Sequence, residues 1–457
     1  MHRKSVFDFR WTCLSLAICL GAISDAAAQP RPTDSSAAML GNPEFLVPPE
    51  PIQLDNMGPL PPLPGFSLVE IEQAALNNSP IVAESLARLD AARWRRLQVG
   101  LRKNPTLGYI GSEIGDDGKA GQQGAYLGQT VIRGNKRGLN RAVVTGEIDR
   151  LGLELSANRL RVLTDVRISF YNLLVLQERE KILLQLDRIA DKTTATARSL
   201  FHAQESPKTD YLQARIEQDR VVLERQATAA SKLAAWHQLL ARVGIDGFPD
   251  LNHTPPKLVG TLKPAKRLMS WDDALTQVLA EHPSIAAGIA QVDRARAKVR
   301  RARAEPISDL KTQFAVQYDN ATGNTFASIN AGFAVPVWDR NQGGIGAACA
   351  EVRQAQAHVR HIEQRLRERL GVVYAQYQVA HTQILRFQNT ILPQAHETQE
   401  LVAEGYRQGD LRFLDFLTAQ RTYYQSNLKY LEALQEYWTS SHRLNGLLLD
   451  GSLTKAL

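Results

Sequence analysis

The sequence predicts a mainly helical protein made of two similar halves, each carrying one pair of short β-strands. Long stretches without proline repeat apolar residues at helical spacing, which predicts helices far longer than a globular core needs. Other stretches alternate apolar and polar residues, which is typical of strands. Short motifs in residues 67–250 also recur about 203 to 205 positions later, in residues 268–450. These three observations favour a duplicated fold.

The composition is that of a folded chain without a nucleic-acid partner. Of the 457 residues, 44% are hydrophobic and 22% are charged. Lys and Arg are interspersed with Asp and Glu along the helical stretches, and the formal net charge is +7. Because no basic motif contains interleaved aromatic residues, the charges indicate solvated helix faces.

The first 28 residues have the three-part layout of a secretory signal peptide. Basic residues precede an apolar run over residues 11–23, and small residues end at Ala28, where we expect cleavage. The run is shorter than the ~20 residues that a spanning helix needs, which disfavours the alternative of an uncleaved anchor. Lipid attachment at Cys19 is a further alternative. After cleavage only Cys349 would remain, so no intrachain disulfide is expected.

Residues 29–66 form a proline-rich N-terminal arm. They contain ten of the 21 prolines in the chain. This density excludes a helix and favours an extended segment, because proline lacks the backbone N–H that a helix interior needs. The folded body is therefore expected to begin at residue 67.

Each half is expected to run helix, hairpin, very long helix, turn and helix. In the first half a helical pattern stops at Asn104-Pro105, and a second one continues without proline from about residue 136 to residue 200. At ~1.5 Å per residue the second helix would be a rod of roughly 100 Å. The second half, residues 268–450, repeats this pattern, and Pro393 is expected to bend or offset its rod. Rods of this length indicate coiled-coil-like packing.

The predicted hairpins lie between these helices. Strands are expected at about 106–114, 124–133, 309–319 and 325–337. In the second hairpin, Phe314, Val316 and Ile329 would form an apolar face, and Gln313, Gln317 and Ser328 a polar face. Strands of ~10 residues with this alternation suit a transmembrane β-barrel, in which the apolar face contacts lipid and the polar face lines the lumen. A half-buried soluble sheet would show the same alternation.

Four strands are too few to close a membrane sheet within one chain. Open edges would leave backbone groups unpaired in hydrocarbon, and the smallest barrels, of about eight strands, have no open lumen. After the signal region no apolar stretch is long enough for a spanning helix, so any crossing would use strands. Three copies would supply twelve strands. The expected assembly is a trimeric 12-stranded β-barrel continued by an α-helical barrel.

Several motifs make the chain similar to the TolC-like outer membrane efflux protein family, and most of all to its heavy-metal efflux (CzcC-like) branch. The resemblance covers residues 67–450. Its motifs are Asn104-Pro105, Gly134-Asn135-Lys136-Arg137, Val335–Gly343, and Tyr406–Asp410 followed by Asp415-Phe416-Leu417. The resemblance implies a passive homotrimeric duct in the outer membrane, surrounded by its lipid and extending into the periplasm. It also implies a periplasmic adaptor (membrane fusion) protein and an inner-membrane pump of the resistance-nodulation-division type as partners.

The turns at the far ends of the rods are the expected periplasmic tips. Candidate adaptor-contacting residues there are Ser206, Pro207, Gln408 and Gly409. In the first turn Ser206-Pro207-Lys208 stands where the family has a glycine turn, which is a departure from the pattern.

Two aspartates near the tips are candidates for a periplasmic gate. In a trimer Asp415 and its repeat partner Asp210 would each form a ring of three carboxylates, and such rings select cations in pores. The resemblance implies that the aspartate matching Asp415 lies at the inner constriction. Both residues also suit helix N-termini, where negative charge favours the helix dipole. Arg421, Tyr423 and Tyr424 are candidate contacts that hold the gate closed.

No catalytic, cofactor or metal site is expected. The spacing of Gly111, Gly115 and Gly118 does not fit a dinucleotide-binding fingerprint. His358 and His361 lie three residues apart on a predicted helix, but the adjacent Arg360 favours a solvated face. The sequence thus predicts an outer-membrane channel subunit of a tripartite efflux system and no enzyme. The alternatives are the outer-membrane duct of a type I protein secretion system and a periplasmic coiled-coil scaffold.

Overall fold

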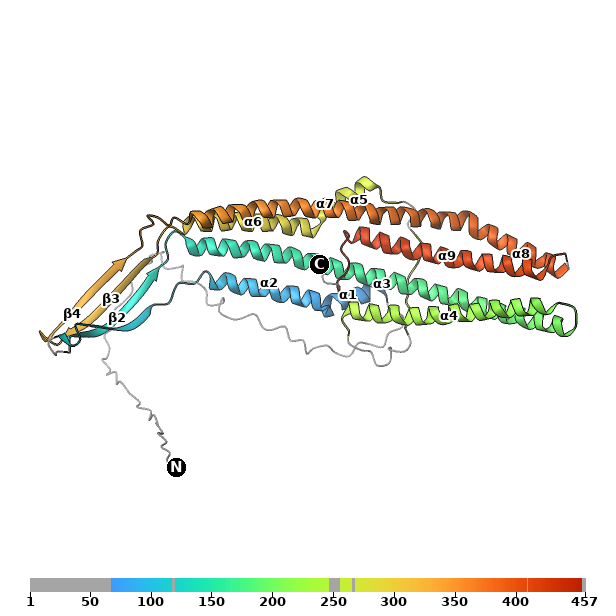
Figure 1. Ribbon diagram of the computed structural model, residues 1–457, viewed down its shortest axis with the longest axis horizontal. Coiled ribbons are helices and arrows are strands. Elements are labelled where there is room, and N and C mark those ends of the chain that lie inside the picture. Colours follow the sequence, from blue (N-terminus) through green and yellow to red (C-terminus); the bar gives the residue numbers. More distant parts are fainter. Residues whose placement is uncertain (1–66, 117–119, 246–254, 265–267, 409, 454–457) are drawn as a thin grey trace, which may run out of the picture. The chain divides into compact units, whose positions relative to one another are not determined.

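The computed structural model describes residues 67–116, 120–245, 255–264, 268–408 and 410–453 (Figure 1). These residues belong to one compact unit, Leu63–Leu457. Within it the long helices run side by side, and the strands extend together beyond one end of the helices (Figure 1). The expected signal peptide, 1–28, and the expected arm, 29–66, lie outside the described residues.

Helices and strands follow the same order in both halves. The first half contains α1 (Leu68–Asn78), α2 (Pro80–Gln98), β1 (Thr106–Ser112), β2 (Gln122–Val131), α3 (Lys136–His202) and α4 (Lys208–Val243). The second contains α5 (Trp271–Glu281), α6 (Pro283–Ala304), β3 (Leu310–Asp319), β4 (Asn324–Gly332), α7 (Gln342–Arg386), the π-helical turn η3 (Phe387–Ile391), α8 (Leu392–Gln408) and α9 (Phe413–Asn445). The expected mainly helical fold with a small β part is confirmed.

The helix starts follow from local capping chemistry. Ser67 caps α1, and its N–H donates to Glu70 Oε2 at 2.9 Å. Proline occupies the first position of both α2 and α6, at Pro80 and Pro283. Proline suits this position because the first N–H of a helix has no partner within the helix.

The two long rods begin in the same unusual backbone conformation. The N-cap residues Asn135 of α3 and Asn341 of α7 are both left-handed, with φ of 50° and 56°. Apart from glycine, asparagine is one of the residues that adopt this conformation most readily. It lets the chain turn from the sheet region into a helix of 67 residues in α3.

The second rod is interrupted where proline was expected to disturb it. The π-helical turn η3 comes directly before Pro393, and the N–H of Leu392 donates to the Phe387 carbonyl five residues earlier. Proline cannot donate the next helical hydrogen bond, and a π-type turn accommodates this by widening the helix locally. The rod is therefore offset at this point and continues as α8.

Two apolar cores hold the helices together. In the first half the core lies between α2, α3 and α4 and includes the fully buried Phe170, Leu173 and Trp236. In the second half it lies between α5, α6, α7 and α9 and includes Leu370 and Tyr437. Helix α3 packs against α4 and α6 along its length and so joins the two halves.

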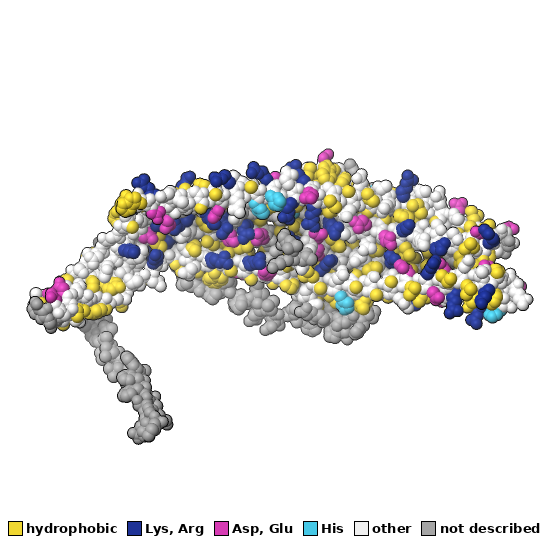
Figure 2. All heavy atoms as spheres, in the orientation of Figure 1, with side chains coloured by type: hydrophobic (Ala, Val, Ile, Leu, Met, Phe, Trp, Pro, Cys, Tyr) yellow, Lys and Arg dark blue, Asp and Glu magenta, His cyan; other side chains and the backbone are white. Residues whose placement is uncertain are grey.

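The strands form one antiparallel sheet in the order β1-β2-β3-β4. Leu107 faces Leu127, Leu127 faces Phe314, and Phe314 faces Ile329, so one apolar row crosses all four strands. These four side chains are 81%, 52%, 47% and 77% exposed, in the order Leu107, Leu127, Phe314 and Ile329. Figure 2 shows hydrophobic side chains on the surface of the strands.

The strand ends differ from the expected ones for local reasons. β1 stops at Ser112 because Glu113 has a left-handed φ of 55°. β4 stops at Gly332, five residues before the expected end, in a segment that contains Pro336, which has no N–H to donate to a ladder. Among the described residues, no helix is both long and apolar enough to span a membrane.

Candidate functional site

The candidate site lies at the turns that join α3 to α4 and α8 to α9, at the helix ends opposite the sheet (Figure 1). In the first turn, the N–H of Glu205 donates to the Leu200 carbonyl at 2.9 Å. Gln204 adopts the left-handed conformation here, with φ of 62°. Glutamine thus occupies the position at which helix ends most often have glycine. Ser206 and Pro207 follow, and Pro207 is the N-cap of α4.

The second turn repeats this hydrogen bond. The N–H of Asp410 donates to the Gly405 carbonyl at 2.9 Å, exactly 205 residues after the bond of the first turn. Gln408 ends α8 and is exposed, and its side chain donates to Glu404 at 2.8 Å. Gly409 lies outside the described residues. The proposed adaptor contacts that are described, Ser206, Pro207 and Gln408, lie at or beside the two turns.

An aromatic cluster joins the two tips. Its buried members are Ala197 of α3, Ala214 of α4 and Phe413 of α9. The half-buried Tyr211, Tyr406, Phe416 and Leu417 pack against them. Burial of aromatic rings contributes a large apolar area with few rotatable bonds, so this cluster fixes the tips of the two halves against each other.

Asp415 lies in the first turn of α9 and pairs with Arg412. Its Oδ2 accepts from the backbone N–H of Arg412 at 3.3 Å and lies 3.4 Å from the Arg412 Nε. The Asp415 side chain is 40% exposed and that of Arg412 is 84% exposed. The carboxylate therefore stabilises the helix start and also remains accessible to solvent.

Asp210 lies in the first turn of α4, at the matching position, but its surroundings differ. Burial raises the pKa of the Tyr406 hydroxyl, and the negative charge of Asp210 raises it further. Asp210 of the first half is therefore close to Tyr406 of the second half. The two aspartates thus have different surroundings: Asp415 pairs with Arg412, whereas the charge of Asp210 acts on the Tyr406 hydroxyl.

The three candidate gate-holding residues lie farther along α9. Tyr424 is buried, and this burial raises the pKa of its hydroxyl to about 12. Its ring packs edge-on against Tyr423, with 5.4 Å between the centroids, and Tyr423 packs in the same way against His396. Arg421 is exposed and lines, with Tyr424, a groove of about 190 Å³ between α3, α4 and α9. None of the hydrogen bonds or ion pairs of the described residues joins these three side chains to Asp415.

The chain is similar to known outer membrane efflux proteins. Residues 274–448 match the model of the family described as "Outer membrane efflux protein". The chain is 26% identical to the cobalt-zinc-cadmium resistance protein CzcC of Cupriavidus metallidurans over 364 residues, which are 79% of this chain and 84% of that protein. The second half of the chain thus matches the outer membrane efflux protein family, and most of the chain is similar to CzcC.

Solved outer-membrane structures share the fold of this chain. The outer membrane protein VceC of Vibrio cholerae superposes with a TM-score of 0.68 at 18% identity, covering 84% of this chain and 96% of that one. The open state of the Neisseria gonorrhoeae MtrE outer membrane channel gives a TM-score of 0.64 at 16% identity, covering 85% and 90%. The matched family acts in efflux at the outer membrane.

The structure also shows site residues that the sequence interpretation missed. Arg412 is the partner of Asp415, and the spacing of three residues at a helix start is the signal that could have revealed it. Phe413 is a buried member of the aromatic cluster, and Tyr406, which packs against it, was noted only as part of the Tyr406–Asp410 motif. In the described part of this chain, no group of three or more His, Cys, Asp or Glu side chains is placed to hold a metal ion.

Proposed function

We propose that three copies of this efflux protein form a passive duct through the outer membrane, as the exit channel of a tripartite efflux system. The observation that carries the proposal is the apolar row from Leu107 to Ile329, which crosses all four strands and is exposed. An exposed apolar row of this extent is unfavourable in water and favourable in lipid.

The sheet edges support the trimer. β1 and β4 are the outer strands of the sheet, and each has one side without a strand partner among the described residues. Backbone groups in hydrocarbon must be paired, so β1 of one copy would pair with β4 of the next. Three copies would then close a 12-stranded barrel. The long helices would continue the barrel into the periplasm as a helical duct.

The tips are the proposed end at which the duct meets its partners. In this proposal Ser206, Pro207, Gln408 and Gly409 contact a periplasmic adaptor, which in turn connects to an inner-membrane pump of the resistance-nodulation-division type. The three Asp415 side chains of the trimer form a ring at the closed end. Arg421, Tyr423 and Tyr424 support the closed state. The aromatic cluster between the tips supports this assignment because it couples the two turns of one chain.

Divalent metal cations are the proposed cargo. The basis is the resemblance to CzcC, whose name specifies cobalt, zinc and cadmium resistance. Deleting the gene should make the cells sensitive to these ions, and re-expression should restore growth. Unchanged metal tolerance together with new drug sensitivity would assign another cargo to the same duct.

Disulfide cross-linking tests the assembly. With Cys349 replaced by Ser, single cysteines on β1 at positions 107–111 would be combined with single cysteines on β4 at positions 326–330. Oxidation in outer membranes should produce covalent dimers and trimers in at least one register, whereas cysteine pairs on the inner strands β2 and β3 should link only within a chain. Monomers throughout the β1–β4 series, in a protein that is properly inserted, would contradict the trimeric barrel.

A further inference from the structure

A large basic groove lies away from the tips and has no role in the duct as proposed. It has a volume of about 1300 Å³ and is lined by α3, α6 and α7 and by the residues that follow α9. Eight Arg or Lys side chains and two His side chains line it, against four carboxylates. The basic side chains are Arg150, Arg161, Arg242, Arg294, Lys298, Arg365, Arg369 and Arg443. The groove is therefore short of negative charge.

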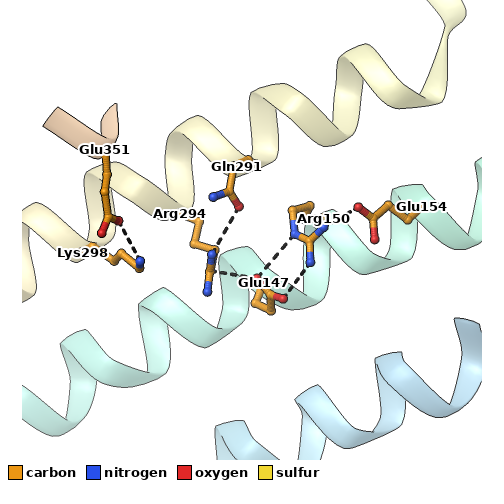
Figure 3. Close-up of polar contacts among 7 residues, drawn as sticks. All are labelled: Glu147, Arg150, Glu154, Gln291, Arg294, Lys298 and Glu351. Atoms are coloured by element: carbon orange, nitrogen blue, oxygen red, sulfur yellow. Dashed lines mark hydrogen bonds and ion pairs between the residues drawn. The ribbon is translucent and has the colours of Figure 1, made fainter. Parts of the chain in front are cut away.

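At one end of the groove the positive charges are nearly balanced by ion pairs with carboxylates (Figure 3). Glu147 lies 2.8 Å from both Arg150 and Arg294, and Arg150 also pairs with Glu154. Lys298 pairs with Glu351 at 2.7 Å. The carboxylates at this end are thus occupied by neighbouring cations and cannot neutralise the rest of the groove.

The carboxylates at the other end are occupied as well. Asp450 pairs with Arg443 at 3.1 Å and also with Arg369. Asp165 is buried and accepts hydrogen bonds from the backbone N–H groups of Gly451 and Ser452. Its carboxylate therefore holds the chain that follows α9.

Three guanidinium groups that line the groove, those of Arg161, Arg242 and Arg365, take part in no ion pair among the described residues. Arg242 donates instead to the Asp165 backbone carbonyl and the Ser169 hydroxyl, which leaves Arg161 and Arg365. Arg161 is half-buried and donates to the neutral Asn158 Oδ1 at 2.6 Å, and Arg365 is exposed. Neither takes part in the ion pairs found among the described residues. Burial lowers the pKa of Arg161, and the nearby positive charge of Arg369 lowers it further, although Asp165 and Asp450 act in the opposite direction. Arg161 thus stays charged in surroundings that favour an added anion.

We propose that this groove binds a soluble, multivalent oxyanion of the phosphate class through Arg161, Arg365 and Arg369. Guanidinium groups present paired N–H donors that match phosphate oxygens, and such charge-assisted bonds strengthen where water is partly excluded. A ligand with several negative charges fits because it can face guanidinium groups on both α3 and α7. A divalent metal cation does not fit, so this site goes beyond the proposed metal duct and does not depend on it.

Inorganic pyrophosphate is the probe for the site. Binding to the purified full-length protein is measured by calorimetric titration at constant ionic strength. Pyrophosphate should bind, sulfate should compete, and sodium chloride of equal ionic strength should not. Arg161→Gln should weaken binding about tenfold, as expected for loss of a charge-assisted bond of about 1.4 kcal/mol, and Arg365→Gln should weaken it severalfold.

The chain offers a matched control for each variant. Arg159 on α3 and Arg367 on α7 are exposed, lie two residues from the tested positions, and do not line the groove. Arg159→Gln and Arg367→Gln remove the same charge and should leave binding unchanged. Because Arg365 is exposed, its variant is expected to fold even if the Arg161 variant does not. Absence of binding at millimolar pyrophosphate, or equal weakening by the control variants, would overturn the proposal.

Discussion

The ring of Tyr406 stacks on the ring of Phe416 across the second tip, with 5.5 Å between their centroids. The first tip contains the same arrangement, since Phe201 stacks on Tyr211 at 6.3 Å, 205 positions earlier. The two tips therefore share a scaffold of stacked rings and a repeated hydrogen bond. They differ in one ion pair, because among the described residues Asp415 of the second tip pairs with an arginine and Asp210 of the first tip does not.

Replacing Asp415 by Asn should change ion selectivity more than stability. The residue is partly exposed and its helix-start contacts contribute about 0.5–1 kcal/mol. Trimers should therefore form normally, while cation selectivity and block by multivalent cations weaken in planar-bilayer recordings. Asp210→Asn is the matched control and should do less. If the Asp415 variant keeps the parent's selectivity and block, the constriction lies elsewhere.

A lysine at position 314 should destabilise the inserted protein more than a lysine at position 313. Phe314 belongs to the apolar row at the middle of β3, whereas Gln313 lies on the opposite face. Phe314→Lys should cost about 2–4 kcal/mol in lipid and Gln313→Lys much less. Unfolding in detergent or bilayers gives the comparison. Thiol labelling is a second measurement: a membrane-impermeant reagent that modified cysteine at 314 and spared 313 would reverse the assigned faces.

The junction between the sheet and α3 depends on a buried ion pair. Lys136 Nζ lies 3.1 Å from Asp309 Oδ1, and the lysine side chain is only 7% exposed. Asp309→Asn should destabilise the fold by about 3 kcal/mol because it leaves a buried ammonium group without its counterion. Lys136→Met should cost less, since Asp309 is 26% exposed and keeps a hydrogen bond from the Arg133 N–H. Chemical denaturation of both variants measures the difference, and equal losses would show that packing dominates.

The two left-handed asparagines should respond differently to glycine. Glycine adopts positive φ without strain, so Asn135→Gly should change stability little, whereas Asn135→Ala should cost about 1 kcal/mol. Asn341 also donates its side-chain N–H to the Ala302 carbonyl at 2.9 Å. Asn341→Gly should therefore still cost about 1 kcal/mol. Equal unfolding midpoints for the two glycine variants would assign no role to that hydrogen bond.

Acid should weaken the protein through His282. This residue is 3% exposed, its Nδ1 accepts from the Ser284 N–H at the start of α6, and burial lowers its pKa to about 4. Between pH 6.5 and about 4 the unfolded chain binds a proton that the folded chain excludes, so stability falls as pH falls through this window, by up to about 3 kcal/mol. His282→Asn keeps an N-cap acceptor but does not titrate. Its denaturation midpoint should change less over this pH range, and an unchanged pH slope would remove His282 as the cause.

Much of the fold could be predicted from the spacing of apolar residues and from the residues that interrupt it. The long helices were predictable because apolar spacing continues without proline, and the small sheet was predictable because the period changes to two. The ends were less predictable. Gln204 takes a left-handed position usually held by glycine, and β1 ends at the left-handed Glu113, and neither residue type signals this conformation.

Less of the candidate site than of the fold could be predicted from the sequence. Motif position pointed to the tips, but it did not single out Arg412, which pairs with Asp415. The basic groove could not be predicted, because Arg161 and Arg365 come from helices about 200 residues apart in the sequence. Their shared surroundings exist only after α3, α6 and α7 have packed.

The outer strands β1 and β4 also set a condition on how the protein matures. A single chain carries two strand edges whose backbone groups have no partner within the sheet. Such edges pair readily with any strand they meet, so an exported chain that waits in water risks aggregation before it reaches the membrane. Safe biogenesis therefore requires that the edges be shielded by a periplasmic chaperone, or that copies meet faster than they encounter other proteins. Yield should then depend on expression rate, with slow synthesis favouring insertion over inclusion in aggregates.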